Sequence, residues 1–250
     1  MKKFKSLLLV AMLVALPVVA SAQDNAAEVK KGTWSGFLTN RLGDNWFIGV
    51  GGTAQLYNGQ HDNLGSFGDR LTFNPELTFG KWLMPTVGFR MQFNGGFTYN
   101  GFTNWRNHPF VVNAAGNAPY KKEWKQYNAY ADALLNLSNW IGGYRYDRTW
   151  DFVAFAGIGF SHVWTPEVHN EFSANAGLIN KIRITDGFGI NLEYRCSMFD
   201  SKFTQEYRSG VYGQREATMH SVSLSLVFNI NNIPFLRCAH MDPCKDYRWY

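Results

Sequence analysis

Residues 87–94 read VGFRMQFN, and this stretch alternates between large apolar side chains and small or polar ones. Val87, Phe89, Met91 and Phe93 take the odd positions, whereas glycine, arginine, glutamine and asparagine take the even ones. Successive side chains of a β-strand point to opposite faces. A strand here has one apolar and one polar face, whereas a helix would scatter the same residues around its surface. The stretch therefore predicts an amphipathic strand.

The same alternation recurs along the chain and predicts eight strands. We expect them at residues 45–57, 70–80, 87–94, 126–137, 150–162, 172–184, 188–195 and 221–230. The apolar faces carry no charged side chain, which suits contact with lipid, because a Lys or Arg at the bilayer midplane costs about 2–4 kcal/mol. Asn180 interrupts one apolar face, and Val153 and Phe155 interrupt one polar face. At Pro75, which cannot donate a ladder hydrogen bond, we expect a bulge or a missing bond.

Alternating strands occur both in soluble sandwiches or lipocalin-like barrels and in membrane barrels, and the connections decide between them. Four are long and polar, and two are short, as in outer-membrane barrels. The long ones are residues 58–69, 95–125, 163–171 and 198–217, and the short ones are residues 81–86 and 185–187, whereas 138–149 is longer than expected. Beyond residue 22, no run of 18 apolar residues predicts a spanning helix. Since only closed barrels otherwise satisfy the backbone in lipid, we expect an all-β, eight-stranded antiparallel up-and-down transmembrane β-barrel.

Residues 1–22 have the pattern of a secretory signal peptide. Lys2, Lys3 and Lys5 precede an apolar run, and Ala20-Ser21-Ala22 fits the small-residue cleavage rule. The run is too short for a membrane anchor, which needs about 20 apolar residues. We then expect a periplasmic segment at residues 23–44, the barrel at 45–230 and a short periplasmic tail at 231–250. This arrangement predicts a location in the outer membrane.

The charge balance of the chain excludes one class of partner. The chain has 24 basic and 19 acidic residues, a formal net charge of +5. Signal cleavage removes three lysines and no acid, which leaves 21 basic against 19 acidic residues, or +2. This small excess gives no reason to expect nucleic acid as a partner.

The three cysteines are Cys196, Cys238 and Cys244. Secretion would place them in an oxidising compartment. Cys238 and Cys244 are close enough in sequence to form a disulfide, and with three cysteines at least one thiol stays free or bonds outside the chain. Their spacing is not that of a metal site, and we expect no metal and no cofactor.

Aromatic residues gather near the ends of the expected strands. Such girdles mark the two interfaces of a membrane barrel. The periplasmic girdle would hold Trp46, Trp82, Trp140, Tyr144, Trp150 and Phe188, and the outer girdle Tyr57, Phe93, Tyr127, Phe160 and Trp164.

The polar faces carry balanced charges that would meet in the lumen. The cations are Arg90, Lys181, Arg183 and Arg195, and the anions are Glu76, Asp132, Asp151 and Glu193. Side chains fill the interior of an eight-stranded barrel, so we expect these ions to close the lumen as a salt-bridged plug. The alternative is a small ion path lined by charge. If the second and third strands pair symmetrically about Leu83, Glu76 lies opposite Arg90.

The signal peptide, the eight alternating strands and the tract YNAYADALLNLSN at residues 127–139 together resemble the OmpA-type family of outer-membrane barrels and the related outer membrane protein β-barrel domains. The resemblance covers residues 43–230. It implies an eight-stranded antiparallel barrel with both ends in the periplasm. Longer members carry a C-terminal peptidoglycan-binding domain, for which residues 231–250 are too short. We therefore do not expect cell-wall binding.

Some eight-stranded barrels are enzymes that deacylate or acylate lipid A. The deacylase type uses a His-x-Ser pair on a strand. No histidine of this chain has a serine two residues on; the six are His61, His108, His162, His169, His220 and His240. Ser161 and His162 are adjacent and would point to opposite faces of a strand, so they cannot act as nucleophile and base. We expect no catalytic residues and a protein that is not an enzyme.

The connection at residues 95–125 is the strongest candidate for contact with a surface ligand. It carries six aromatic residues: Phe97, Tyr99, Phe102, Trp105, Phe110 and Tyr120. Exposed aromatics mark binding surfaces, but these side chains could equally fold over the barrel mouth or dip into lipopolysaccharide. We expect a monomer in contact with outer-membrane lipid and lipopolysaccharide, with a structural, adhesive or surface-interaction role. The alternatives are a small-solute or ion channel and, third, a lipid A-modifying enzyme.

Overall fold

The computed structural model of the chain describes residues 42–59, 65–112, 114–166, 168–200 and 216–235. The signal peptide expected at residues 1–22 lies outside these ranges, and so does most of the segment at 23–44. The pairing of Cys238 with Cys244, and most of the tail at 231–250, also lie outside them.

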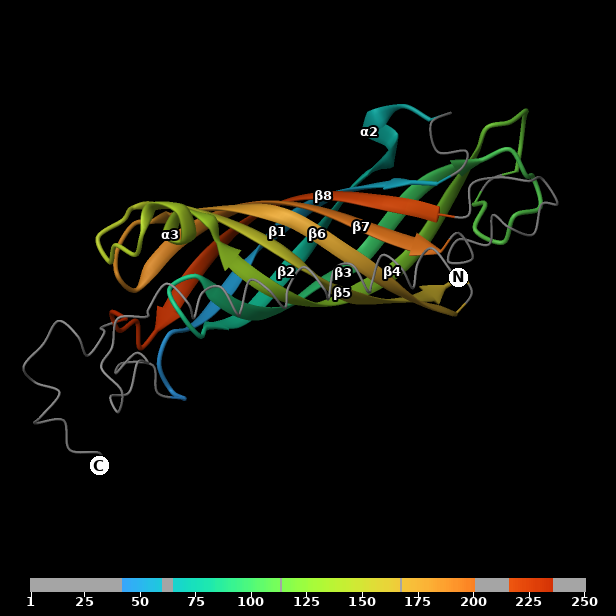
Figure 1. The fold of residues 1–250 in the computed structure, drawn as a ribbon. Coiled ribbons are helices and arrows are strands. Elements are labelled where there is room, and N and C mark those ends of the chain that lie inside the picture. Colours follow the sequence, from blue (N-terminus) through green and yellow to red (C-terminus); the bar gives the residue numbers. More distant parts are fainter. Residues whose placement is uncertain (1–41, 60–64, 113, 167, 201–215, 236–250) are drawn as a thin grey trace, which may run out of the picture.

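Eight strands form a closed antiparallel barrel in which each strand pairs with its sequence neighbours and β1 pairs with β8 (Figure 1). This confirms the expected fold class. The strands are β1 (Trp46–Asn58), β2 (Leu71–Trp82), β3 (Val87–Thr103), β4 (Tyr120–Asn136), β5 (Trp150–Thr165), β6 (His169–Arg183), β7 (Phe188–Asp200) and β8 (Glu216–Ile230).

The two ends of the barrel differ. One end, called the turn end here, holds the described chain ends, the turns at residues 83–86 and 184–187, and α3 (Leu137–Gly142). The opposite end, called the loop end, holds α2 (Phe67–Arg70) and the connection between β3 and β4. The helix α3 explains the long connection expected at 138–149. Neither short helix in the described ranges has the length or apolar character that a membrane crossing needs.

The strands β3 and β4 are longer than the sequence pattern predicted. The connection expected at residues 95–125 is in fact only residues 104–119, because β3 runs on to Thr103 and β4 starts at Tyr120. A bulge between Gly95 and Thr98 shifts the register of β3 against β4. Gly95 and Gly96 both have positive φ, of 124° and 105°, a region that favours glycine. The bulge changes which residues of β3 face inward, so simple alternation along the sequence did not predict that the strand continues beyond it.

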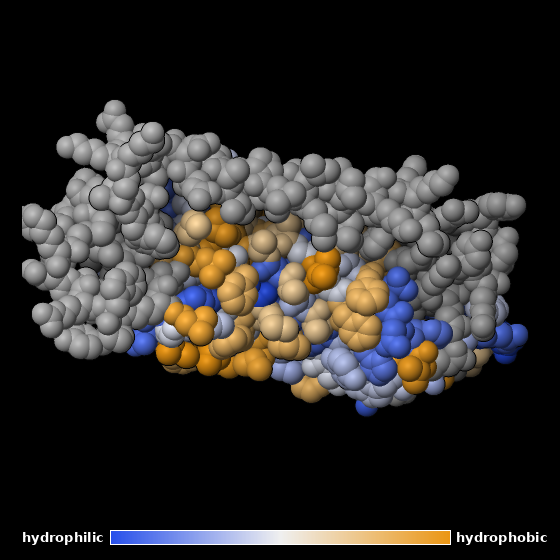
Figure 2. Space-filling view, turned by 60° about the horizontal axis from the view of Figure 1, so that its bottom comes forward, coloured by the Kyte–Doolittle hydropathy of each residue, from blue (hydrophilic) through white to orange (hydrophobic). Residues whose placement is uncertain are grey.

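The outer face of the barrel wall is apolar, as expected for a surface in lipid. Exposed aliphatic and aromatic side chains cover its middle (Figure 2). Leu224 of β8 is 58% exposed and Val50 of β1 is 44% exposed. The one polar residue in a predicted apolar row, Asn180, accepts a hydrogen bond at 3.2 Å from the indole Nε1 of Trp150. This pair lies near the turn end of β5 and β6.

A charge on this outer face should destabilise the barrel according to its depth. Leu224 pairs with Gly52 and Leu192, midway along its strands. We expect Leu224→Arg to lower the free energy of unfolding by about 2–4 kcal/mol, measured by urea titration in lipid vesicles. Ile230→Arg, at the end of β8, is the matched control and should cost only about 0–1 kcal/mol. Equal losses at both positions would contradict a lipid-facing surface.

Candidate functional site

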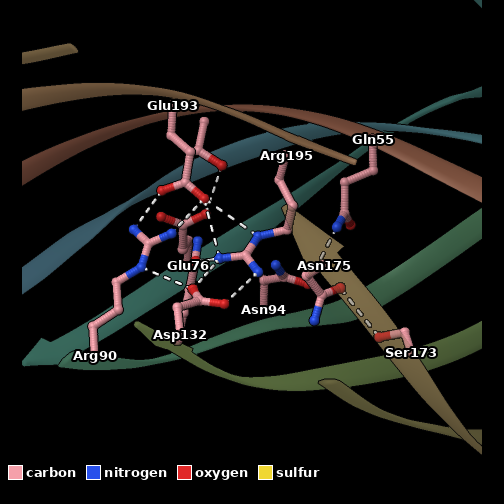
Figure 3. A network of polar contacts seen from close by, with 11 residues as sticks. Gln55, Glu76, Arg90, Asn94, Asp132, Ser173, Asn175, Glu193 and Arg195 are labelled. Atoms are coloured by element: carbon pink, nitrogen blue, oxygen red, sulfur yellow. Dashed lines mark hydrogen bonds and ion pairs between the residues drawn. The ribbon is translucent and has the colours of Figure 1, made fainter. Parts of the chain in front are cut away.

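Two arginines and two carboxylates meet at the centre of the lumen, and we call Arg90, Asp132, Glu193 and Arg195 the central ion cluster (Figure 3). The Arg90 guanidinium donates to both oxygens of Glu193, at 2.5 and 2.8 Å, and to Asp132 Oδ2 at 2.9 Å. Arg195 donates to Asp132 Oδ2 at 2.6 Å and to Oδ1 at 3.1 Å. All four side chains are at most 3% exposed. The formal charges of the cluster sum to zero, as burial in a low dielectric demands.

The strand pairing brings these ions together from opposite walls. Arg90 and Asp132 are direct partners on β3 and β4. Glu193 and Arg195 lie two residues apart on β7 and therefore share its inner face. Gly157 makes room beside the cluster, because a Cβ there would lie 2.5 Å from Asp132 Oδ1. The backbone thus leaves a space that the four ions fill.

Phe155 forms the floor of the central ion cluster. Its ring lies 4.4 Å from Arg90 Cζ and 4.6 Å from Arg195 Cζ, within range of cation–π attraction. Tyr130 contributes a second ring, 4.2 Å from Arg195 Cζ. The apparent exception of Phe155 on a polar face is therefore part of the ion site.

The expected pairing of Glu76 with Arg90 is wrong. Glu76 pairs with Asn94 across β2 and β3, and Arg90 lies opposite Gly80. The turn is centred at residue 85, two positions beyond Leu83, which moves the partner of Glu76 four residues along β3. Leu83 and Met84 both donate their N–H to the Val87 carbonyl in this turn. Glu76 instead accepts a hydrogen bond from the Ser223 hydroxyl at 2.6 Å.

A layer of amides lies above the central ion cluster, toward the loop end. Its members are Gln55, Asn74, Asn94, Gln126 and Asn128, all buried. Asn74 donates to Gln55 at 2.9 Å, and Asn128 donates to Asn94 at 2.9 Å. The Tyr99 hydroxyl donates to Gln55 at 2.5 Å and accepts from Asn128 at 3.0 Å. These bonds span β1, β2, β3 and β4 and hold the walls together.

Apolar side chains close the lumen at the loop end, and we call this cluster the aromatic plug. It consists of Tyr57, Tyr99, Phe110, Trp124, Val163, Phe199, Ala217 and Met219, each at most 2% exposed. The Trp124 ring stacks on Tyr99 at 5.9 Å and meets Tyr57 edge-on at 5.2 Å. Tyr57 therefore points into the barrel, and its assignment to the outer girdle was wrong.

The aromatics expected on a 95–125 loop divide into two groups. Tyr99 and Phe110 are buried in the aromatic plug, and Tyr120 is only 9% exposed. Phe97 remains 60% exposed. For most of these side chains, the structure favours the interpretation that they fold over the barrel mouth.

A second apolar layer lies below the central ion cluster, toward the turn end. It contains Phe47, Leu134, Val153, Phe155, Ile179 and Val227, with Trp82 packed against it. Trp82 thus faces this layer, 6.4 Å from the Phe47 ring, and does not belong to the lipid-facing girdle. Apolar layers therefore lie on both sides of the polar middle of the lumen.

The other expected lumen ions lie at the mouth of the turn end. The Lys181 ammonium lies 5.4 Å from the Trp82 ring. Asp151 Oδ1 forms an ion pair with Arg148 Nη1 at 3.5 Å, and Arg183 Nη1 forms one with Asp186 Oδ1 at 3.7 Å. Arg148 and Asp186 come from connections, so the strand pattern did not reveal them.

The residues considered for catalysis are arranged as expected. Ser161 faces the lumen and donates to Asn128 Oδ1 at 2.5 Å. His162 faces outward, 2.6 Å from Asn170 Oδ1 and 5.1 Å from the Tyr127 ring. Within the described ranges no group of three His, Cys, Asp or Glu side chains is placed to hold a metal ion.

A closed barrel that is apolar outside and filled inside defines a transmembrane β-barrel protein. Comparison with known proteins shows which membrane proteins it resembles. No protein-family model matches the chain. Outer membrane protein 40 of Porphyromonas gingivalis (strain ATCC BAA-308 / W83) is 32% identical over an alignment that covers 96% of this chain and 61% of that protein. Outer membrane protein 41 of the same strain is 24% identical over 81% of this chain and 51% of its own length.

The chain therefore spans about three fifths of the first relative and half of the second. Among solved structures, Neisserial surface protein A covers 74% of this chain and 96% of its own, at 11% identity and a TM-score of 0.43. The fold assignment does not use this low similarity, because the strand pairing itself shows the closed barrel. From its fold, its lipid-facing surface and its sequence relatives, the protein is a β-barrel of the outer membrane.

Substitution of one carboxylate should show how much the central ion cluster contributes to the free energy of unfolding. Asp132→Asn leaves two buried arginines with a single anion, and we expect a loss of about 3–5 kcal/mol in unfolding free energy. Asp147→Asn is the control, because its ion pair with Arg145 is solvent-exposed and such pairs contribute little. Unfolding in vesicles, followed by gel mobility without boiling, provides the measurement. A small and equal effect of both substitutions would show that the cluster does not hold the barrel together.

Proposed function

We propose that this protein is a non-conducting outer-membrane barrel with a structural or surface-interaction role. One observation carries the proposal: four successive layers fill the lumen. From the loop end these are the aromatic plug, the amide layer, the central ion cluster and the lower apolar layer. Apolar layers are unfavourable for ion passage because an ion would leave water there without compensation. This filling supports a role for the barrel as a scaffold.

The orientation in the membrane is part of the proposal. The short turns at residues 83–86 and 184–187 lie at one end, together with the longer connection at 137–149, whereas the connections at residues 59–70 and 104–119 lie at the other. The long connection expected at residues 163–171 is wrong: it is only residues 166–168, because β5 runs on to Thr165 and β6 starts at His169. In outer-membrane barrels short turns face the periplasm. The turn end would then be periplasmic and the loop end extracellular. Residues 1–22 would be a signal peptide, and residues 23–44 and 231–250 would be periplasmic segments flanking the barrel at 45–230. The OmpA-type resemblance implies the same orientation.

The β3–β4 hairpin is the part of the loop end proposed to contact a surface partner. Its connection carries exposed residues, among them Val112 at 62% exposure, next to the buried Phe110. Phe110 fixes the connection over the barrel mouth, because its ring packs in the aromatic plug with side chains of other strands. Within the hairpin its carbonyl accepts from Glu123 N–H. A connection anchored in this way presents its outer residues in a defined geometry. The partners would be lipopolysaccharide around the barrel and a ligand above it, with the protein acting as a monomer.

An ion or small-solute channel is the second candidate, and the polar middle of the lumen favours it. Gln92 Nε2, Asn175 Nδ2 and Ser221 Oγ are buried without a protein partner among the described residues. A polar, partly unpaired wall beside charged groups is what a narrow ion path needs. A lipid A-modifying enzyme ranks third, and mass spectra of lipid A with and without the protein would reveal one.

Conductance separates the scaffold from the channel. We expect refolded wild-type protein in planar bilayers to give no stable single-channel steps. Trp124→Ala should also stay closed, because the lower apolar layer still blocks the lumen when the aromatic plug is weakened. Reproducible steps from wild-type protein, alongside a porin as positive control, would overturn the scaffold proposal.

The orientation has its own test. A protease site inserted at Gly116, in the exposed connection of the loop end, should be cleaved on intact cells. The same site inserted at Gly143, exposed at the turn end, should be cleaved only after lysis. Gel analysis of the fragments measures both, and the reverse result would invert the proposed orientation.

A further inference from the structure

The seam between β2 and β3 has the shortest run of paired residues in the described part of the barrel wall. β2 and β3 pair only from Glu76↔Asn94 to Trp82↔Gly88. Beyond this point Leu71–Pro75 of β2 keep their pairing with β1 but have no register with β3. The two strands separate at Pro75, which cannot donate to a ladder, and at the bulge that begins with Gly95. This confirms the expected missing bond at Pro75, on the side of β2 that faces β3.

Two glycines and one proline occupy the row of outward positions at the start of this seam. Gly52 of β1 pairs with Pro75, and Gly95 of β3 is the next outward position across the seam. The row below carries Val50, Leu77 and Phe93, which face lipid. We call the resulting hollow the lateral groove.

The lateral groove is a shallow hollow that is open on its outer side. It has a volume of about 590 Å³ and is lined mainly by Val50, Pro75, Leu77, Phe93, Gly95 and Tyr127. Glu76, Asn94 and Asn128 lie at its inner limit. The groove is therefore apolar on its walls and polar only at its deepest point.

Access to the lateral groove comes from the membrane side. Toward the loop end, the lumen behind it is closed by the aromatic plug, with Tyr99 and Trp124 each 1% exposed. The amides at its inner limit already bond one another, as Asn128 does to Asn94 at 2.9 Å. An apolar ligand gains nothing by breaking these bonds. Its walls are continuous with the apolar band that faces lipid.

We propose that the lateral groove binds one hydrocarbon chain, an acyl chain of a neighbouring bilayer lipid. The chain would lie along Val50, Leu77 and Phe93 and over the flat floor of Gly52, Pro75 and Gly95. Burial of apolar surface on both partners drives the contact, and close fit supplies its dispersion energy. The lipid head would then lie toward the loop end, beside the separated edges of β2 and β3. One polar group there is already satisfied, since Phe97 N–H donates to Asn74 Oδ1 at 3.0 Å.

The test uses the full chain refolded in phosphatidylcholine vesicles that contain a phosphatidylcholine with a photoactivatable diazirine on one acyl chain. After illumination, mass spectrometry of peptides locates the label. We expect the label to concentrate on peptides that contain Val50, Leu77 and Phe93. Gly52→Leu places a side chain in the groove without a clash, since the nearest atom to an added Cβ is Asn74 O at 3.8 Å. This variant should reduce the groove label about fivefold, because it fills the volume that the chain would occupy.

Ala176→Leu is the matched control, since Ala176 also faces lipid, on β6 far from the seam. It should leave the groove label unchanged. Gly52→Ala gives an intermediate reduction and remains informative if Gly52→Leu fails the gel-shift test for folding. Label spread evenly over all outward strand faces, or unchanged in both Gly52 variants, would overturn the proposal. Label from a diazirine fatty acid added in the aqueous phase, without label from the bilayer lipid, would also overturn it.

Discussion

The need to satisfy backbone N–H and C=O groups inside lipid governs this structure. A strand with a free edge in hydrocarbon leaves several such groups unpaired, each at a cost of several kcal/mol. The pairing of β1 with β8 removes that edge and closes the ring. Closure fixes which side chains face lipid and which face the lumen. Every other property of the protein follows from this division.

The lumen is narrow, and closure brings its polar side chains within reach of one another. Charges held in such a space must neutralise, and Arg90, Asp132, Glu193 and Arg195 do so in one cluster. Apolar layers on both sides separate the cluster from the two mouths. The same packing that stabilises the ions also blocks the path along the axis. Because the lumen is filled, the surfaces left for binding are the outer ones, and in the outer wall the strand pairing is shortest between β2 and β3.

Face assignments could be predicted from the sequence, whereas partners could not. Alternation placed Arg90, Asp132, Glu193 and Arg195 in the lumen correctly, because the period of a strand is local. It failed for the Glu76–Arg90 pair, since that pair depends on where the turn at residues 83–86 is centred. The girdle assignment of Tyr57 was wrong because it rested on residue type and place near a strand end, whereas the parity of Tyr57 is that of an inward residue. The length of β3 was missed because the bulge at Gly95 reverses the parity beyond it.

The sequence by itself determined the class of fold, the number of strands, the charge-free outer face and the identity of the central ions. These properties follow from the order of residues along one strand. The tertiary structure alone decided which ions pair, and that Tyr99 and Trp124 close the loop end. Those outcomes depend on register between strands and on the stagger of a closed ring. Register couples residues as far apart as Arg90 and Glu193, and no local pattern encodes it.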